Sequence, residues 1–225
     1  FWGPARDMFE AAGACNATWE NPATMAIPTS EEGTQQACFA DTEGERFRHV
    51  LREGLRLDQW CTIAMRRGTY DGIHEGVNRK ATLVLQNKLP GLQKYRWRSI
   101  LAGAIPTCDR LFRAGKLESP ICQCCGQAPE TVRHMFLECP VHNEQRFATL
   151  PPEAWEILPD CLRLHGILPL RVPALPEGYP PTPDDMAELT ASVQYALLDI
   201  LQHRDAFCSW QPPQPRWAAA RGAST

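Results

Sequence analysis

Four side chains with metal-binding chemistry lie close together in the sequence. They are Cys122, Cys125, His134 and Cys139, which form a C-x2-C-x8-H-x4-C pattern. The short first spacing lets two thiolates reach one ion from a tight turn, and the longer second spacing lets the chain reverse direction. Three sulfur donors and one nitrogen donor suit a tetrahedral Zn²⁺ ion and leave no open position for catalysis. The pattern therefore predicts one structural zinc ion.

Neighbouring residues leave alternatives to this ligand set open. Cys124 lies between the first two ligands, His142 could stand in for Cys139, and Cys108 could be recruited from upstream. A buried cysteine-rich turn without metal is another alternative. So is a redox Cys-x-x-Cys pair, but such a pair normally begins a helix in a βαβ unit, and the sequence indicates no such unit.

A basic segment precedes the cysteines. Residues 46–116 contain fifteen Lys or Arg and five Asp or Glu, a net charge of +10, although the whole chain carries −3. Residues 1–45 carry −7 and residues 117–225 carry −6. Basic side chains neutralise phosphates of any base sequence, and exposed aromatic rings stack on unpaired bases. We predict sequence-nonspecific binding of RNA or DNA by Arg79, Lys80, Lys88, Lys94, Arg96, Trp97, Arg98, Arg110, Arg113 and Lys116.

Helical periodicity dominates the segments that would position these residues. Apolar residues recur every three or four positions in four segments: 43–68, 72–88, 92–102 and 184–206. Shorter helices are expected near 107–115, 141–149 and 153–158, and few alternating runs predict strands. The basic residues can also be read as the solvated faces of these helices, with Trp97 in the core. The predicted fold is mainly α, a helical body with a small CCHC zinc knuckle and long irregular Pro-rich segments.

These patterns divide the chain into six expected regions. They are an acidic, poorly ordered lead-in (1–42), a basic helical region (43–118), a zinc-knuckle module (119–150), a Pro-rich connector (151–183), a C-terminal helix (184–206) and a disordered tail (207–225). The connector is expected to be irregular because residues 151–183 contain nine prolines. Each proline removes a backbone donor and fixes φ.

The cysteine segment resembles a known family. The residues from Cys122 to Cys139, with Glu130-Thr131 before the histidine and Met135-Phe-Leu-Glu-Cys-Pro after it, resemble the zinc-binding domain at the C-terminal end of non-LTR (LINE-type) retrotransposon reverse transcriptases. The similarity covers about residues 70–170. It implies an accessory region that binds template RNA or target DNA and contacts upstream reverse transcriptase domains. It implies no catalytic residue here, because the polymerase's aromatic-x-Asp-Asp site is missing from the sequence.

Composition argues against other classes. No stretch approaches 18 consecutive apolar residues, so neither a membrane helix nor a membrane partner is expected. The chain begins Phe-Trp-Gly-Pro, without Met or a signal segment, so we expect an intracellular protein, in the nucleus or cytoplasm, cut from a longer polypeptide. The acidic flanks favour one alternative function, a zinc-stabilised protein-interaction module with no nucleic-acid role. A decayed retroelement remnant is a third reading.

Overall fold

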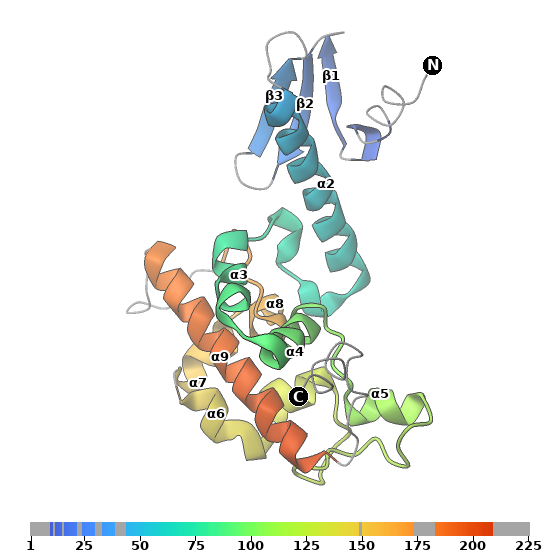
Figure 1. Cartoon of the computed structure of the whole chain (residues 1–225), viewed down its shortest axis with the longest axis vertical. Helices are drawn as coiled ribbons and strands as arrows, with labels where there is room; N and C mark the ends of the chain where they lie inside the picture. The colour runs from blue at the N-terminus through green and yellow to red at the C-terminus, as the bar shows by residue number, and fades with distance from the viewer. Residues whose placement is uncertain are drawn as a thin grey trace, which may run out of the picture.

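The protein is mainly α-helical, as predicted. The computed structural model describes residues 10, 12–14, 16–21, 24–29, 33–38, 44–148, 150–172 and 183–208. A small sheet lies at one end of a long helix, α2 (Gly44–Arg66), and a helical body lies at the other end (Figure 1). None of the helices in these ranges is long and apolar enough to cross a membrane.

The small sheet was not predicted. Strands β1 (Thr18–Asn21), β2 (Thr24–Thr29) and β3 (Gly33–Cys38) pair antiparallel in the order β1-β2-β3. Met25 and Ile27 alternate along β2, so both lie on one face, and both are fully buried with Val50 of α2. The expectation of a poorly ordered lead-in over residues 1–42 is therefore wrong for these strands. Strands β1 and β3 are short and largely polar, and the apolar part of β2 is only Met25 to Ile27, so the local pattern was too short to reveal the sheet.

Three helices of the basic region follow α2. They are α3 (Arg79–Lys88), α4 (Gly91–Leu101) and α5 (Cys108–Arg113). The helix predicted over 72–88 is interrupted. A 3₁₀ turn, η2 (Ile73–Glu75), precedes Gly76, whose φ of +114° leaves the helical region. The side chain of Asn78 then accepts a hydrogen bond from the backbone N–H of Ala81 (3.1 Å) and begins α3.

The segment expected to be a Pro-rich connector is largely part of the core. It contains α7 (Pro152–Ile157) and α8 (Asp160–His165), and Leu162 and Leu164 are fully buried. Helix α7 confirms the short helix predicted near 153–158, whereas α8 was not predicted, and the expectation of irregular chain is wrong there because the prolines begin helices instead of breaking them. Pro152 occupies the first turn of α7 and Pro159 the N-cap position of α8, where no helical N–H is lost. Residues 173–182 of the predicted connector lie outside the described residues.

The last helix, α9 (Pro183–Phe207), crosses the helical body and packs against α3, α4, α6 (Asn143–Phe147) and α8 (Figure 1). Its predicted apolar stripe is buried in the main core, which also contains Trp97, Phe136 and Leu162. The members of the stripe with at most 6% exposure are Leu189, Val193, Ala196, Leu197, Ile200 and Leu201. The predicted disordered tail lies outside the described residues from position 209 onward.

Candidate zinc centre and basic surface

The first two cysteines lie in a tight turn. An isolated bridge joins Ile121 to Pro129, and the N–H of Cys122 donates to the carbonyl of Ala128 (2.8 Å). Inside this turn the N–H of Gly126 donates to the carbonyl of Cys122 (2.8 Å). Gly126 has a φ of +68°, a conformation that favours glycine. The local fold therefore turns Cys122 and Cys125 toward the same side of the loop.

Of the other two candidate ligands, His134 begins a π-helical turn, η3 (His134–Glu138), and Cys139 directly follows it. The hydroxyl of Thr131 accepts a hydrogen bond from the N–H of His134 (3.0 Å), and the N–H of Cys139 donates to the carbonyl of His134 (2.7 Å). The π-helical turn ends at Glu138, and Pro140 begins the 3₁₀ turn η4 (Pro140–His142). These bonds hold the imidazole and the third thiol beside the first two thiols.

The four side chains come together in the geometry that tetrahedral zinc requires. Their ligand atoms all lie within 4.8 Å of one another. Two thiolates about 2.3 Å from one tetrahedral ion are separated by about 3.8 Å, and a thiolate and an imidazole nitrogen by about 3.5 Å. The Sγ atoms of Cys122 and Cys139 are 3.9 Å apart, and Cys125 Sγ lies 3.3 Å from His134 Nε2. The cluster fits one structural zinc ion.

Burial controls the protonation of these thiols. It raises the pKa of Cys122, and it raises the pKa of Cys139 to about 12. Burial acts in the same direction at Cys125, but hydrogen bonds from the backbone at Gln127 and from neighbouring thiols outweigh it and lower the pKa. A thiol must lose its proton to ligate zinc, so zinc binding releases protons and weakens in acid.

The alternative ligands lie outside the four-residue group. Cys124 is half-buried, and burial raises its pKa to about 12. The Nδ1 atom of His142 lies 3.3 Å from the Nδ1 atom of His203 on α9. Cys108 begins α5, with its Sγ 4.0 Å from Arg204. In the described part of the chain, the structure thus assembles the first ligand set that the spacing suggested.

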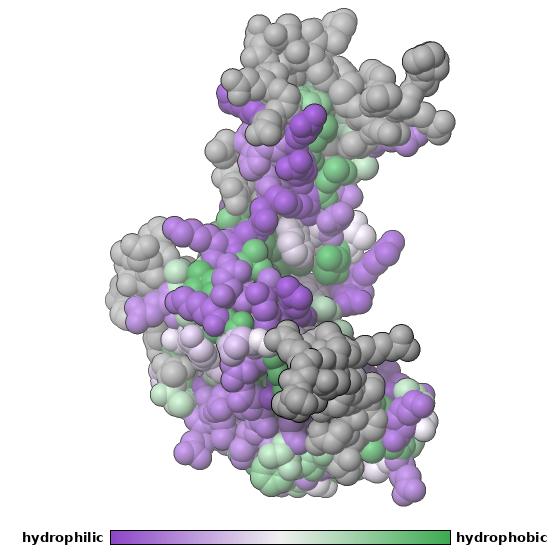
Figure 2. All heavy atoms as spheres, viewed as in Figure 1, coloured by the Kyte–Doolittle hydropathy of each residue, from purple (hydrophilic) through white to green (hydrophobic). Residues whose placement is uncertain are grey.

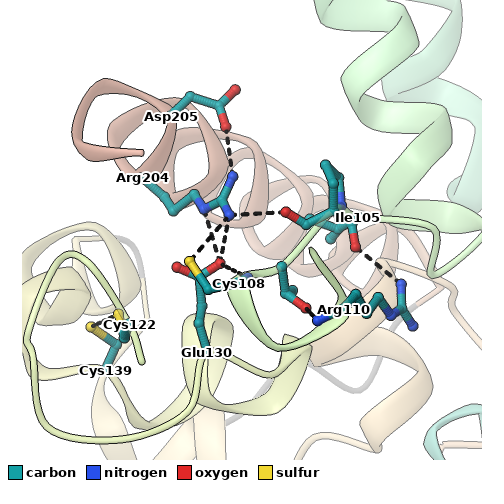
Figure 3. A network of polar contacts seen from close by, with 10 residues as sticks. Ile105, Cys108, Arg110, Cys122, Glu130, Cys139, Arg204 and Asp205 are labelled. Carbon is teal, nitrogen blue, oxygen red and sulfur yellow. Dashed lines mark hydrogen bonds and ion pairs between the residues drawn. The ribbon is translucent and has the colours of Figure 1, made fainter. Parts of the chain in front are cut away.

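A buried ion pair ties the cysteine loop to α9 and to α5 (Figure 3). Glu130 and Arg204 are 1% and 2% exposed, and Glu130 Oε1 accepts hydrogen bonds from Arg204 Nε (3.0 Å) and Nη2 (2.6 Å). The same oxygen accepts from the N–H of Cys108 (3.0 Å), and Arg204 Nη2 also donates to the carbonyl of Pro106 (2.9 Å).

A second arginine supports the third thiol. Arg146 of α6 is buried and donates to the carbonyls of Phe136 (2.8 Å) and Cys139 (3.0 Å). Sequence reasoning missed Arg146, Glu130 and Arg204. Their partners lie up to 98 positions away, and no local pattern marks a charged residue as buried.

The predicted nucleic-acid residues fall into three groups. Trp97 is fully buried in the main core, so it is not available to stack on a base, and its assignment to the interface is corrected. Four arginines make internal contacts. Arg79 reaches Glu53, Arg96 pairs with Asp205 (2.8 Å), Arg110 donates to the carbonyls of Gly103 and Ile105, and Arg113 pairs with Asp109.

The remaining five cations make no ion pair or side-chain hydrogen bond with the residues that the structure describes. They are Lys80, Lys88, Lys94, Arg98 and Lys116. Lys94 and Arg98 are separated by one turn of α4 and share one of its faces, with the half-exposed ring of Tyr95 beside them. Hydrophilic side chains cover much of the face of the helical body on which α3 lies (Figure 2).

Comparison with known proteins agrees with the cysteine cluster. Residues 67–145 match the protein family described as zinc-binding in reverse transcriptase. The match includes α3, α4, α5 and all four candidate ligands. It confirms the resemblance to a reverse transcriptase zinc-binding domain over this segment. No curated protein and no solved structure gave a match.

Proposed function

We propose that this chain is an accessory region of a retroelement reverse transcriptase, or of a gene derived from one, and that it binds RNA or DNA beside a structural zinc centre. Cys122, Cys125, His134 and Cys139 are the proposed zinc ligands. Because all four positions of the ion are filled by protein, the zinc supports the fold and activates no water. Contacts with upstream reverse transcriptase domains and an intracellular location belong to the same proposal.

The observation that carries this proposal is a set of cations without an ion pair among the described residues, in the segment that leads into the zinc loop and matches a reverse transcriptase zinc-binding family. The charge of a cation in an internal ion pair is already compensated by a carboxylate. Lys94 and Arg98 project from α4 without such a partner among the described residues. Each can neutralise one phosphate and release a counterion.

The zinc loop supports the basic surface through α5. Glu130 lies inside the loop and accepts the N–H of Cys108, the first residue of α5. Arg110 and Arg113 follow on that helix, and Lys116 comes just after it. If zinc holds the loop closed, it also holds the start of α5, so metal loss is expected to weaken nucleic-acid binding indirectly.

The test measures the affinity of the zinc-loaded chain for single-stranded RNA and DNA as a function of salt. We expect the logarithm of the association constant to fall linearly with the logarithm of salt, with a slope of about −0.7 for each phosphate contacted. Reversing two charges on α4, Lys94→Glu with Arg98→Glu, should abolish most of the binding. The matched control is Arg48→Glu with Arg52→Glu, two exposed cations that are also one turn apart but lie on α2.

Two results would contradict the proposal. One is the absence of binding to any nucleic acid at low salt, which would favour the protein-interaction module instead. The other is equal loss of affinity in the α4 and α2 variants, which would show that only the total charge matters and that the α4 surface has no special role.

A further inference from the structure

A groove lined by arginines lies between the C-terminal end of α2 and α4. It has a volume of about 530 Å³, and its walls include Trp60, Ile63, Arg66, Arg67, Tyr70 and Arg98. A second hollow of about 520 Å³ adjoins it, because Arg67, Tyr70 and Ala102 line both. The second hollow adds Arg110 and the edge of His165. Together they form one arginine groove, defined by Arg66, Arg67, Arg98 and Arg110.

Among the described residues, no acidic side chain compensates the charge in this groove. No Asp or Glu of the described residues lines either hollow. Arg66 and Arg98 are exposed, and their side chains form no ion pair or hydrogen bond with described residues. Four guanidinium groups in a concave site, without a carboxylate, repel one another, so the site gains from an anion that enters it.

Two of the four guanidinium groups are held in position. Arg67 donates to the carbonyl of Ala102 (3.3 Å) and lies 5.9 Å from the ring centroid of Tyr70. Arg110 donates to the carbonyls of Gly103 and Ile105 (3.1 Å to the second). These bonds use neutral carbonyls, so they orient each guanidinium without neutralising it. Orientation in advance lowers the entropic cost of binding an anion.

The groove also contains one buried histidine, His165. Burial lowers the pKa of His165 to about 4, and the charges of Arg67 and Arg110 act in the same direction, against the hydrogen bond with Ile100 and the charge of Asp160. His165 is therefore neutral at pH 7 and adds no charge of its own. Its ring stacks on Tyr70, which lines both hollows, at 3.9 Å between centroids.

We propose that the arginine groove binds the sugar-phosphate backbone of a single nucleic-acid strand, a proposal that rests on the proposed function and locates its main contact. Guanidinium groups match phosphate oxygens in a bidentate manner, and Arg66, Arg67 and Arg98 supply them along one groove. The half-buried Trp60 and Ile63 give the same groove an apolar wall suited to an unpaired base. A duplex presents phosphates on a rigid convex surface and keeps its bases stacked inside, so it uses neither the concavity nor this wall.

The test uses the full zinc-loaded chain and a labelled oligo-uridine of about 15 nucleotides. The groove variant is Arg66→Gln with Arg98→Gln. The matched control is Arg48→Gln with Arg52→Gln, which removes two exposed cations of α2 that lie outside the groove. We expect the groove variant to lose about tenfold in affinity at low salt and to reduce the salt slope by about 1.4. The control pair should lose several-fold less.

The failures of the two proposals are distinguishable. If the wild-type chain binds no nucleic acid, the proposed function fails and the groove assignment falls with it. If the wild type binds and the two variants lose affinity equally, the proposed function stands and the groove assignment is wrong. A duplex of equal length that binds as tightly and responds equally to Arg66→Gln with Arg98→Gln overturns the assignment to a single strand. Displacement of the RNA by an equal charge concentration of poly-glutamate would show a site for acidic polypeptides and also overturns it.

Discussion

The zinc loop and the helical core are stabilised by opposite means. The inner side of the loop is made of three thiols and an imidazole, whereas the core around α9 is made of apolar side chains such as Trp97, Leu162 and Val193. The loop therefore needs an ion to compensate its polar interior, and the core needs only exclusion of water. The two regions meet at the buried pair of Glu130 and Arg204, which couples their stabilities.

Removing one zinc ligand should cause the largest loss of stability, and this loss should fall on the zinc loop and not on the helical core. Structural zinc contributes on the order of 10 kcal/mol to folding of its module. We expect Cys125→Ser and His134→Ala to lose the ion and to lose amide protection over residues 119–142, while α3 and α9 keep theirs. Metal analysis with hydrogen exchange measures both effects.

The matched control for this experiment is Cys124→Ser. Cys124 is the immediate neighbour of Cys125 but lies outside the four-residue group. We expect it to retain one zinc ion per chain. Zinc retained by Cys125→Ser, or lost by Cys124→Ser, would contradict the proposed ligand set.

Breaking the connection between loop and core should have the next largest effect. Arg204→Met leaves the carboxylate of Glu130 buried without its partner, which costs about 3–5 kcal/mol of unfolding free energy. The double variant Arg204→Met with Glu130→Gln removes both charges and should recover a large part of this loss. Denaturant unfolding of the zinc-loaded wild type, the two single variants and the double variant measures the free energy of unfolding of each. Additive losses would show that the two side chains do not act as a pair.

A pH titration should reveal a smaller loss of stability, which comes from a buried histidine and not from the zinc loop. His165 is buried, and its pKa falls from 6.5 to about 4 in the folded state, chiefly because of burial. Its Nδ1 atom lies 3.1 Å from the carbonyl of Ile100, which can only accept, so Nδ1 carries the proton of the neutral ring. Because the folded pKa is below the unfolded one, its contribution is complete above pH 6.5. It is lost as the pH falls toward 4, by about 3 kcal/mol.

The measurement for His165 compares the wild type with His165→Asn at saturating zinc across this pH range. Both proteins share the acid sensitivity of the zinc thiolates, so the difference between them isolates the imidazole. We expect the variant to be less stable at pH 7 and the gap to narrow in acid. A gap that stays constant from pH 7 to 4 would contradict the assigned pKa.

The comparison also explains which parts of the protein could be predicted from sequence. The zinc ligands and α9 rest on local patterns, a ligand spacing and an apolar period, and both were predicted. The strands β1–β3 and the buried segment around α8 rest on contacts with distant helices, and both were missed. Trp97 shows the same limit, because its local sequence allowed both a surface position among basic neighbours and a core position. The contact that decides is distant in sequence: a Cβ at Gly166, after α8, would lie 2.3 Å from the ring of Trp97.

The smallest expected loss of stability comes from an exposed ion pair next to the buried pair of Glu130 and Arg204. Asp205 follows Arg204 on α9 and pairs with Arg96 of α4 at 2.8 Å, but these side chains are 23% and 28% exposed. Water screens this pair, so Arg96→Gln and Asp205→Asn should each cost less than about 1 kcal/mol, with a coupling of about 0.5 kcal/mol in the double variant. Glu130 and Arg204 join the same two kinds of charge at 2.6 Å with almost no exposure. Denaturant unfolding measures the coupling free energy of each pair. Equal coupling free energies for the buried and the exposed pair would contradict the idea that burial makes the pair of Glu130 and Arg204 the stronger one.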